Sequence, residues 1–197
     1  MTRRNANLPD ALEAERARLF ALLGRLLSAA PDAALLAGLA GLRGDASPLG
    51  SALSGLAEAA ASARPQAVEQ EYFALFIGVG RGELLPYASY YLTGFLHERP
   101  LAELRARLAR LGIVRSPEVA EPEDHLAFLC EAYAGLLEGR FGRREDAPEF
   151  FDRHLRPWAG RCCADLEGAA AAVFYRAVGR LGRTAFEIEQ AALELPA

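Results

Sequence analysis

The segment EPEDHLAFLCEAYAGLLEG, residues 121–139, indicates the fold class of this chain more clearly than any other stretch. Its larger apolar residues recur at intervals of three and four, which puts them within one arc of a helical wheel. These residues are Leu126, Leu129, Cys130, Tyr133, Leu136 and Leu137. Pro122 suits a first helical position, and Glu123 and Asp124 would then stand in the first turn, where carboxylates favour the positive end of the helix dipole. The segment therefore predicts an amphipathic helix with one face in a core.

Helical spacing of apolar residues continues on both sides of this segment. Helices are predicted over residues 10–29, 31–42, 49–63, 65–76, 99–112 and 150–181, with a short final helix that Thr184 caps. No stretch has the two-residue alternation of a β-strand. The sequence thus predicts an all-α fold: a single compact helical domain over residues 1–197, with about seven to nine helices and a hinge that could lie near 112–122.

The composition is that of a soluble globular chain with one domain. Of its 197 residues, 52% are hydrophobic and 24% are charged. The net charge is −4 and the pI is about 5.5, which argues against a nucleic-acid-binding protein because such proteins usually carry a basic face. No run approaches the roughly 20 apolar residues that a membrane-spanning helix needs, so no membrane insertion is expected.

The cysteines and the N-terminal residues indicate the compartment. Cys130, Cys162 and Cys163 are too few for the dense cysteine framework of a small secreted domain, and we expect them to be buried small side chains. The first ten residues, MTRRNANLPD, hold two arginines but no apolar stretch or cleavage site, so neither a secretory nor a twin-arginine leader is predicted. A reducing, cytoplasmic location is therefore expected.

Signals for an enzyme or a metal site are weak. His97, His125 and His154 have no chelating spacing of four residues, and no nucleophile motif accompanies them. The segment GVGRGE (78–83) does not match a dinucleotide loop, because Glu83 stands where the third glycine would be and no strand precedes it. The sequence therefore predicts no catalytic residue, no metal and no cofactor.

Residues 77–91, IGVGRGELLPYASYY, interrupt the helical pattern. Three glycines and a proline within ten residues are too irregular for a helix, and tyrosines follow them. Exposed backbone beside Pro86, Tyr87, Tyr90 and Tyr91 suits a groove for a peptide. A tyrosine-rich patch of the core is the alternative.

Carboxylates gather near this loop and at the start of the 121–139 segment. They are Glu69, Glu71, Glu83, Glu121, Glu123 and Asp124. A partner with paired guanidinium groups would find bidentate acceptors there, whereas a solvated acidic surface is the alternative. For residues 121–125 alone, the alternative to a binding site is a charged helix start with His125 at the margin of the core.

Three blocks of the chain together resemble the TorD/DmsD family of redox-enzyme maturation chaperones. EQEYFALFIGVGRGELLPYASYY (69–91) is similar to that family's Tyr-x-x-Leu-Phe, glycine and Pro-x-x-Ser-x-Tyr segment. EPEDHLAFL (121–129) resembles its Glu-Pro-x-Asp-His signature, and FFDRHLRPWAGRCCADLEGAAAAVFY (150–175) resembles its closing Phe-x-x-His-Leu-x-x-Trp helix. The three blocks occur in family order, which makes the resemblance more specific than any single motif.

The resemblance implies a cytoplasmic chaperone and not an enzyme. Such proteins bind the twin-arginine signal peptide of a molybdopterin-dependent oxidoreductase and hold the precursor until cofactor insertion and folding precede export. The peptide-binding residues carried over from the family are Pro86, Tyr87, Ser89 and Tyr90 of the loop, with Glu121, Pro122, Asp124 and His125 of the helix start. The closing block, with Phe151, His154, Leu155 and Trp158, is assigned to packing.

A signal peptide of this kind offers two adjacent arginines and then an apolar segment, so carboxylates beside aromatic surface suit both of its halves. Asp124 is expected to pair with a guanidinium, while Tyr87 and Tyr90 stack on arginine or cover the apolar stretch. His125 is expected to hydrogen-bond the peptide or to orient Asp124.

Two other functions stay open. A related chaperone could serve a cytoplasmic molybdoenzyme subunit, of the formate dehydrogenase or nitrate reductase type, without reading twin arginines. An enzyme could instead use the Glu-Asp-His cluster with a nucleotide at the glycine loop. The expected partner is the precursor of a molybdenum-cofactor oxidoreductase, with no nucleic acid and no stable membrane insertion, bound by a monomer or by a dimer that swaps helices about 112–122.

Overall fold

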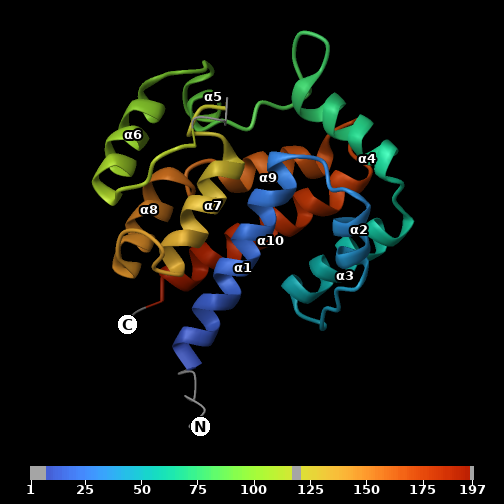
Figure 1. Ribbon diagram of the computed structural model, residues 1–197, viewed down its shortest axis with the longest axis horizontal. Helices are drawn as coiled ribbons and strands as arrows, with labels where there is room; N and C mark the ends of the chain where they lie inside the picture. Colours follow the sequence, from blue (N-terminus) through green and yellow to red (C-terminus); the bar gives the residue numbers. More distant parts are fainter. Residues whose placement is uncertain (1–7, 117–120, 196–197) are drawn as a thin grey trace.

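Three helices form the centre of the fold: α1 (Leu8–Ser28), α7 (Leu126–Leu137) and α10 (Phe174–Leu193). In the computed structural model, which describes residues 8–116 and 121–195, α1 packs along α7 and also contacts α10. Figure 1 shows the three helices crossing the middle of the molecule. Most of the first ten residues, for which no leader is predicted, lie outside the described part of the chain.

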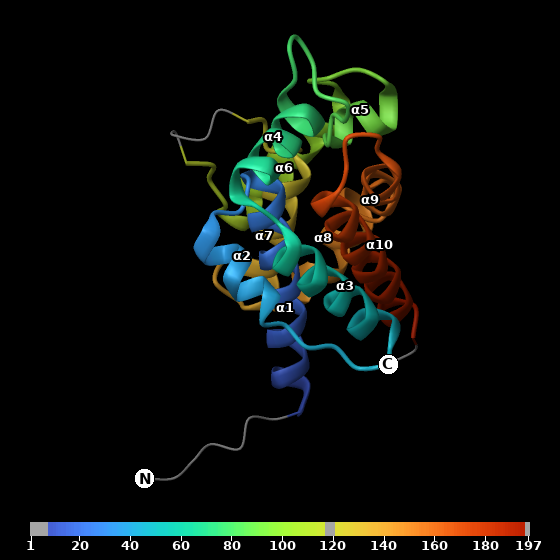
Figure 2. The same ribbon diagram turned by 90° about the vertical axis from the view of Figure 1, so that its right-hand side faces the viewer.

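One side of the molecule is made by α2 (Ala33–Ala40), α3 (Pro48–Ser62) and α4 (Pro65–Tyr72). α3 packs on both α2 and α10. A π-helical turn, Phe73–Ile77, extends α4 and leads into the glycine loop. This side faces the viewer in Figure 2.

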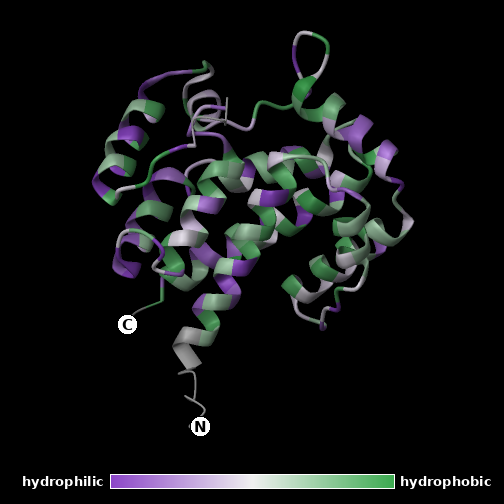
Figure 3. Ribbon diagram, viewed as in Figure 1, coloured by the Kyte–Doolittle hydropathy of each residue, from purple (hydrophilic) through white to green (hydrophobic). Residues whose placement is uncertain are grey.

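The other side is made by α5 (Ala88–Thr93), α6 (Arg99–Leu111) and α8 (Ala147–His154), with a 3-10 turn (Arg144–Asp146) before α8. α9 (Ala159–Gly168) packs along α10. Figure 3 shows polar residues of α4 and α6, in purple, at the outer edges of the molecule. Among the described residues, no helix is long and apolar enough to cross a membrane.

The prediction of an all-α, single compact helical domain is confirmed, because residues 8–116 and 121–195 form ten α-helices and no β-strand. The number of helices is slightly above the predicted seven to nine. The predicted helix over 150–181 is in fact α8, α9 and the start of α10. The predicted cap at Thr184 is also wrong, since Thr184 is buried inside α10.

Two carboxylates from a distant segment produce the break between α9 and α10. Glu71 accepts hydrogen bonds from the backbone N–H groups of residues 173–175, at N···O distances of 2.6–3.0 Å. Glu83 accepts hydrogen bonds from the N–H groups of residues 170–171, at 2.7 and 3.0 Å. The Glu71 contacts satisfy N–H groups that the start of α10 leaves without a helical partner, and the Glu83 contacts hold the turn before it. Glu71 and Glu83 are therefore structural caps rather than acceptors for a ligand.

The core confirms the amphipathic pattern of α7 and the packing role of the closing block. The apolar arc predicted for α7 is buried, and Phe20 of α1 meets Tyr133 edge to face with ring centroids 4.8 Å apart. Phe151, Leu155 and Trp158 are buried as predicted. All three cysteines are buried and reduced, and burial raises the pKa of the Cys162 thiol to about 12.

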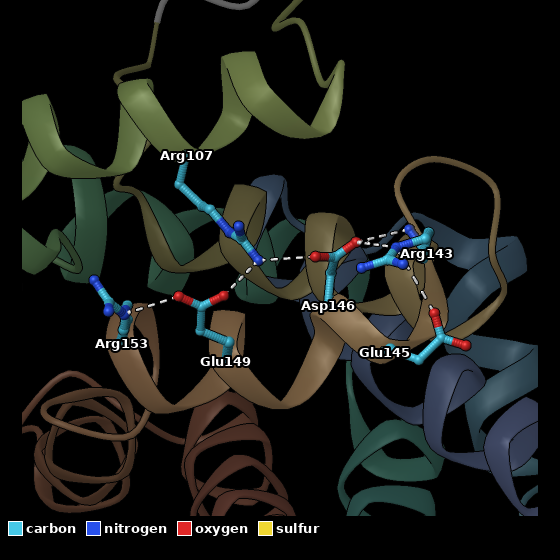
Figure 4. A network of polar contacts seen from close by, with 6 residues as sticks. All are labelled: Arg107, Arg143, Glu145, Asp146, Glu149 and Arg153. Atoms are coloured by element: carbon cyan, nitrogen blue, oxygen red, sulfur yellow. Dashed lines mark hydrogen bonds and ion pairs between the residues drawn. The ribbon is translucent and has the colours of Figure 1, made fainter.

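Ion pairs fasten α6 to the α8 side of the molecule (Figure 4). Arg107 of α6 lies 3.1 Å from Asp146 and 2.8 Å from Glu149. Glu149 also pairs with Arg153, at 3.2 Å. The connection from α6 to α7 holds the predicted hinge, of which residues 117–120 lie outside the described part of the chain, so the hinge and the helix swap stay predictions.

Candidate functional site

The glycine-loop segment and the start of α7 form one surface. Two backbone hydrogen bonds, of 2.9 and 2.8 Å, join residues 86–88 to residues 124–126. Tyr87 and His125 form an isolated antiparallel bridge, and their rings meet edge to face with centroids 5.0 Å apart. Two segments that the sequence separates by more than thirty residues thus make a common wall.

Asp124 lies behind this wall. It is 1% exposed, and its Oδ2 accepts hydrogen bonds from the N–H of Ser89 at 2.9 Å and from the Ser89 hydroxyl at 2.6 Å. The carboxylate therefore caps the start of α5 instead of the first turn of α7. The expectation that Asp124 faces a ligand guanidinium is wrong, because its carboxylate is turned inward onto Ser89, which is itself buried.

His125 is the N-cap of α7, which begins at Leu126 and not at residue 121 as predicted. Its Nδ1 accepts a hydrogen bond from the N–H of Ala127 at 3.1 Å. Burial lowers the pKa of His125 to about 4, although Glu121 and Asp124 both act to raise it. The imidazole is therefore neutral at physiological pH, with its proton on Nε2 and its Nδ1 used by the helix.

Tyr87 and Glu121 form a hydrogen bond at the edge of this wall, in which the phenol donates to the carboxylate. Burial and the neighbouring Glu121 raise the pKa of Tyr87, so the phenol keeps its proton. Glu121 is exposed, and Pro122 beside it is half-buried. Pro122 does not begin a helix, because residues 121–125 form a turn before α7.

Glu123 binds arginines from the α6 side. It lies 2.8 Å from Arg105 and 3.6 Å from Arg115. Burial acts to raise the pKa of Glu123, but the hydrogen bond from Arg105 and the two positive charges outweigh it and lower the pKa. Glu123 therefore holds the turn onto α6 and is not available as a free acceptor.

Tyr87, Glu121 and His125 line a cavity of about 920 Å³, here called the first cavity. Its other walls come from the turn at 28–33 between α1 and α2, from α4 with the π-helical turn, and from α7. Its larger apolar and aromatic lining residues are Pro31, Tyr72, Phe76, Ile77, Pro86, Tyr87 and Phe128. Its size and mixed lining suit a peptide or another ligand of similar bulk.

The charged lining of the first cavity has one sign. Among the residues that the structure describes, no arginine lines it and four carboxylates do: Asp32, Glu69, Glu121 and Glu131. None of the four forms an ion pair with any residue in the described part of the chain. Since His125 is neutral, the cavity offers acceptors and apolar surface but no positive charge. It suits a ligand that brings guanidinium groups and an apolar segment.

Four of the eight residues that the resemblance implied line this cavity: Pro86, Tyr87, Glu121 and His125. Ser89 and Asp124 support its wall from behind, and Tyr90 lines a separate cavity. Sequence reasoning missed Phe128 and Glu131, which a search of the second face of α7 would have found. It also missed the turn at 28–33, which has no sequence motif of a binding site. The packing of α1 on α7 places this turn at the first cavity.

No group of three or more histidine, cysteine or acidic side chains is arranged to hold a metal ion within the ranges that the structure describes. The hydrogen-bonded contacts of the Glu-Asp-His cluster are all structural.

A model of the protein family described as nitrate reductase delta subunit matches residues 42–164. The chaperone protein TorD of Actinobacillus succinogenes is 32% identical over 92 residues, which are 47% of each chain. The chaperone protein YcdY of Escherichia coli K12 is 32% identical over 119 residues, 60% of each chain. The chain thus spans about half the length of the curated relatives that it matches.

The fold is also found in a crystal structure from Archaeoglobus fulgidus, that of a protein described as a "Putative Redox Enzyme Maturation Protein". The TM-score is 0.58 at 20% sequence identity, over 93% of this chain and 96% of the other. At this identity the similarity concerns the fold alone.

Proposed function

The chain belongs to the nitrate reductase delta subunit family, and on that premise we propose that it is a cytoplasmic chaperone for the maturation of a molybdenum-cofactor oxidoreductase. The chaperone binds the twin-arginine signal peptide of the precursor in the first cavity. It holds the precursor until cofactor insertion and folding precede export, and it catalyses no reaction.

The observation that carries this proposal is a set of four carboxylates on an aromatic cavity, none of them ion-paired and with no arginine beside them among the described residues. Asp32 and Glu121 each already accept one hydrogen bond, from the start of α2 and from Tyr87. Two adjacent guanidinium groups of a leader would each donate a bidentate pair of hydrogen bonds to a carboxylate, which is stronger and more directional than a contact with a single point charge. The apolar part of the leader would cover the ring of Phe76 and the half-exposed Ile77.

The proposal assigns different roles to the residues of the resemblance. Tyr87, Glu121 and His125 contact the peptide, and Pro86 forms part of the cavity wall. Asp124 and Ser89 are positioning residues that act through α5.

Isothermal titration with a synthetic twin-arginine leader of the cognate oxidoreductase tests the proposal. The variant Asp32→Asn/Glu69→Gln/Glu131→Gln keeps the cap of α2, because asparagine is as good an N-cap as aspartate, and removes three charges. It is expected to bind the leader about 100-fold more weakly. Glu58→Gln, at an exposed carboxylate outside the cavity, is the matched control. Failure of wild type to bind any such leader would overturn the proposal.

A second candidate is an assembly chaperone for a cytoplasmic molybdoenzyme subunit, which the description of the matching family favours. This chaperone would recognise a segment without twin arginines. A leader with both arginines changed to lysine separates the two: the first function predicts a marked loss of affinity, because lysine cannot form the bidentate pairing, and the second predicts little change.

A further inference from the structure

A second cavity, of about 440 Å³, adjoins α5 and shares no lining residue with the first. It lies between the end of the glycine loop, α5 and α9. Its charged and aromatic lining residues are Arg81, Glu83, Tyr90, Tyr91, Arg161 and Asp165.

The carboxylates of this second cavity are already in use. Both oxygens of Glu83 accept hydrogen bonds from the backbone of residues 170–171. The Oδ2 of Asp165 accepts a hydrogen bond from the Tyr91 hydroxyl at 2.9 Å. A ligand that brings donors would therefore have to displace contacts that hold the fold.

The guanidinium groups of the second cavity are not matched by carboxylates. Arg81 is exposed and forms no ion pair with any residue of 8–116 or 121–195. Arg161 lies over the ring of Tyr91, 5.1 Å from its centroid, and donates one hydrogen bond to the Tyr91 carbonyl. It forms no ion pair within the described ranges either. A guanidinium has five N–H donors, so both arginines keep donors that face solvent.

Exposed apolar side chains occur in the segments that supply this cavity's lining. Leu92 lines it, and Phe95, which is 70% exposed, follows two residues after the end of α5. Val79, 98% exposed, stands in the glycine loop that supplies Arg81. Figures 1 and 2 both show this loop and α5 at the same end of the molecule. Grouped exposed apolar residues of this kind mark an interaction surface.

We infer that the second cavity binds a peptide segment of a partner protein in which carboxylates stand next to apolar side chains. The carboxylates pair with Arg81 and Arg161, and the apolar side chains cover Leu92 and Phe95. The apolar rim favours a peptide over a small anion, which would use the arginines alone. This site does not depend on leader binding in the first cavity.

Selection from a random phage-displayed 12-residue library on the immobilised full-length chain tests the inference without a known partner. The selected peptides are expected to be enriched in Asp and Glu next to Leu and Phe. Synthetic copies of them should bind Arg81→Gln/Arg161→Gln at least about tenfold more weakly than wild type. They should bind Arg110→Gln with wild-type affinity, because Arg110 is an exposed arginine of α6 that does not line the second cavity.

Arg161→Lys and a thermal melt of each variant separate lost charge from lost structure. Lysine keeps the positive charge but not the bidentate geometry, so Arg161→Lys should bind the peptides more tightly than Arg161→Gln and more weakly than wild type. Selected peptides without acidic enrichment would overturn the inference. So would acidic peptides whose binding does not respond to the double substitution. Displacement of the peptides by millimolar inorganic phosphate would also overturn it, because the site would then be one for a small anion.

Discussion

The first and second cavities adjoin the same short segment, residues 86–91, yet their polar groups are used in opposite ways. Among the described residues, none of the four carboxylates of the first cavity forms an ion pair and no arginine lines it, although Asp32 and Glu121 each accept one hydrogen bond from the protein. In the second cavity the carboxylates of Glu83 and Asp165 accept hydrogen bonds from other groups of the protein, whereas the arginines keep N–H donors that face solvent. The residue types that line a cavity therefore do not by themselves say what it binds. The presence of arginines and the hydrogen bonds that the carboxylates already accept decide it together.

The shared segment is fixed from behind by Asp124, and removal of that carboxylate is expected to have the largest effect. Asp124→Ala leaves the Ser89 N–H and hydroxyl buried without a partner, which should lower the free energy of unfolding by about 3 kcal/mol. Both cavities should lose affinity together. Glu121→Ala, at an exposed carboxylate three residues before Asp124, should lower the free energy of unfolding by less than about 1 kcal/mol. Urea unfolding measures both, and equal losses would contradict the role given to Asp124.

His125 lines the first cavity and not the second, and its protonation makes the stability of the fold at that cavity depend on pH. Its pKa is lowered to about 4 in the folded chain, so between that value and the ordinary value near 6.5 the unfolded chain binds more protons. The stability that this residue contributes is complete above pH 6.5 and is lost as the pH falls toward 4.

His125→Asn keeps an N-cap acceptor and removes this titration. Between pH 7 and pH 5 the variant should lose about 2 kcal/mol less unfolding free energy than wild type. The exposed His97→Asn serves as the control and should follow wild type. Identical pH profiles for wild type and His125→Asn would refute the burial of this imidazole.

A substitution of Glu83 should affect the second cavity and not the first, because Glu83 anchors the loop that carries Arg81. Glu83→Ala should lower the unfolding free energy by about 1 kcal/mol, since two partly exposed N–H groups lose their acceptor. The variant should bind acidic peptides several-fold more weakly than wild type and should bind the leader peptide with unchanged affinity. Glu98→Ala, at an exposed carboxylate before α6, is the control. If Glu83→Ala weakened only the binding of the leader, the assignment of Glu83 to the second cavity would be contradicted.

The hydroxyl of Tyr87 should matter least. Tyr87→Phe removes the hydrogen bond to Glu121, an exposed contact worth less than about 1 kcal/mol. Because Glu121 is then free to pair with a guanidinium, the affinity for the leader should stay within about threefold of wild type. A tenfold loss in titration calorimetry would mean that the phenol itself holds the ligand.

The parts of the fold that the sequence predicted are those governed by local spacing. The apolar arc of α7 is continuous in the sequence, so its burial followed from helical periodicity alone. The break at 169–173 could not be predicted, because a run of alanines contains no stop signal and because Glu83 and Glu71, which bind the backbone there, lie 87 and 102 residues away in the sequence.

The same limit applies to the site. Tyr87, Glu121 and His125 were found through the motifs that contain them, whereas the inward turn of Asp124 depends on Ser89, 35 residues earlier. The carboxylates that are close together in the sequence are of two kinds: some line the first cavity and others are bound within the protein. Only their partners in the folded chain distinguish the two kinds. Glu69 and Glu121 face the first cavity, while Glu123 is paired with arginines.

One crossed titration tests the contrast between the cavities most directly. The twin-arginine leader and a selected acidic peptide are each titrated into wild type, into Asp32→Asn/Glu69→Gln/Glu131→Gln, and into Arg81→Gln/Arg161→Gln. The account predicts that the first variant loses only the leader and the second loses only the acidic peptide. Loss of both peptides in the same variant, with the fold intact, would contradict two cavities of opposite charge preference.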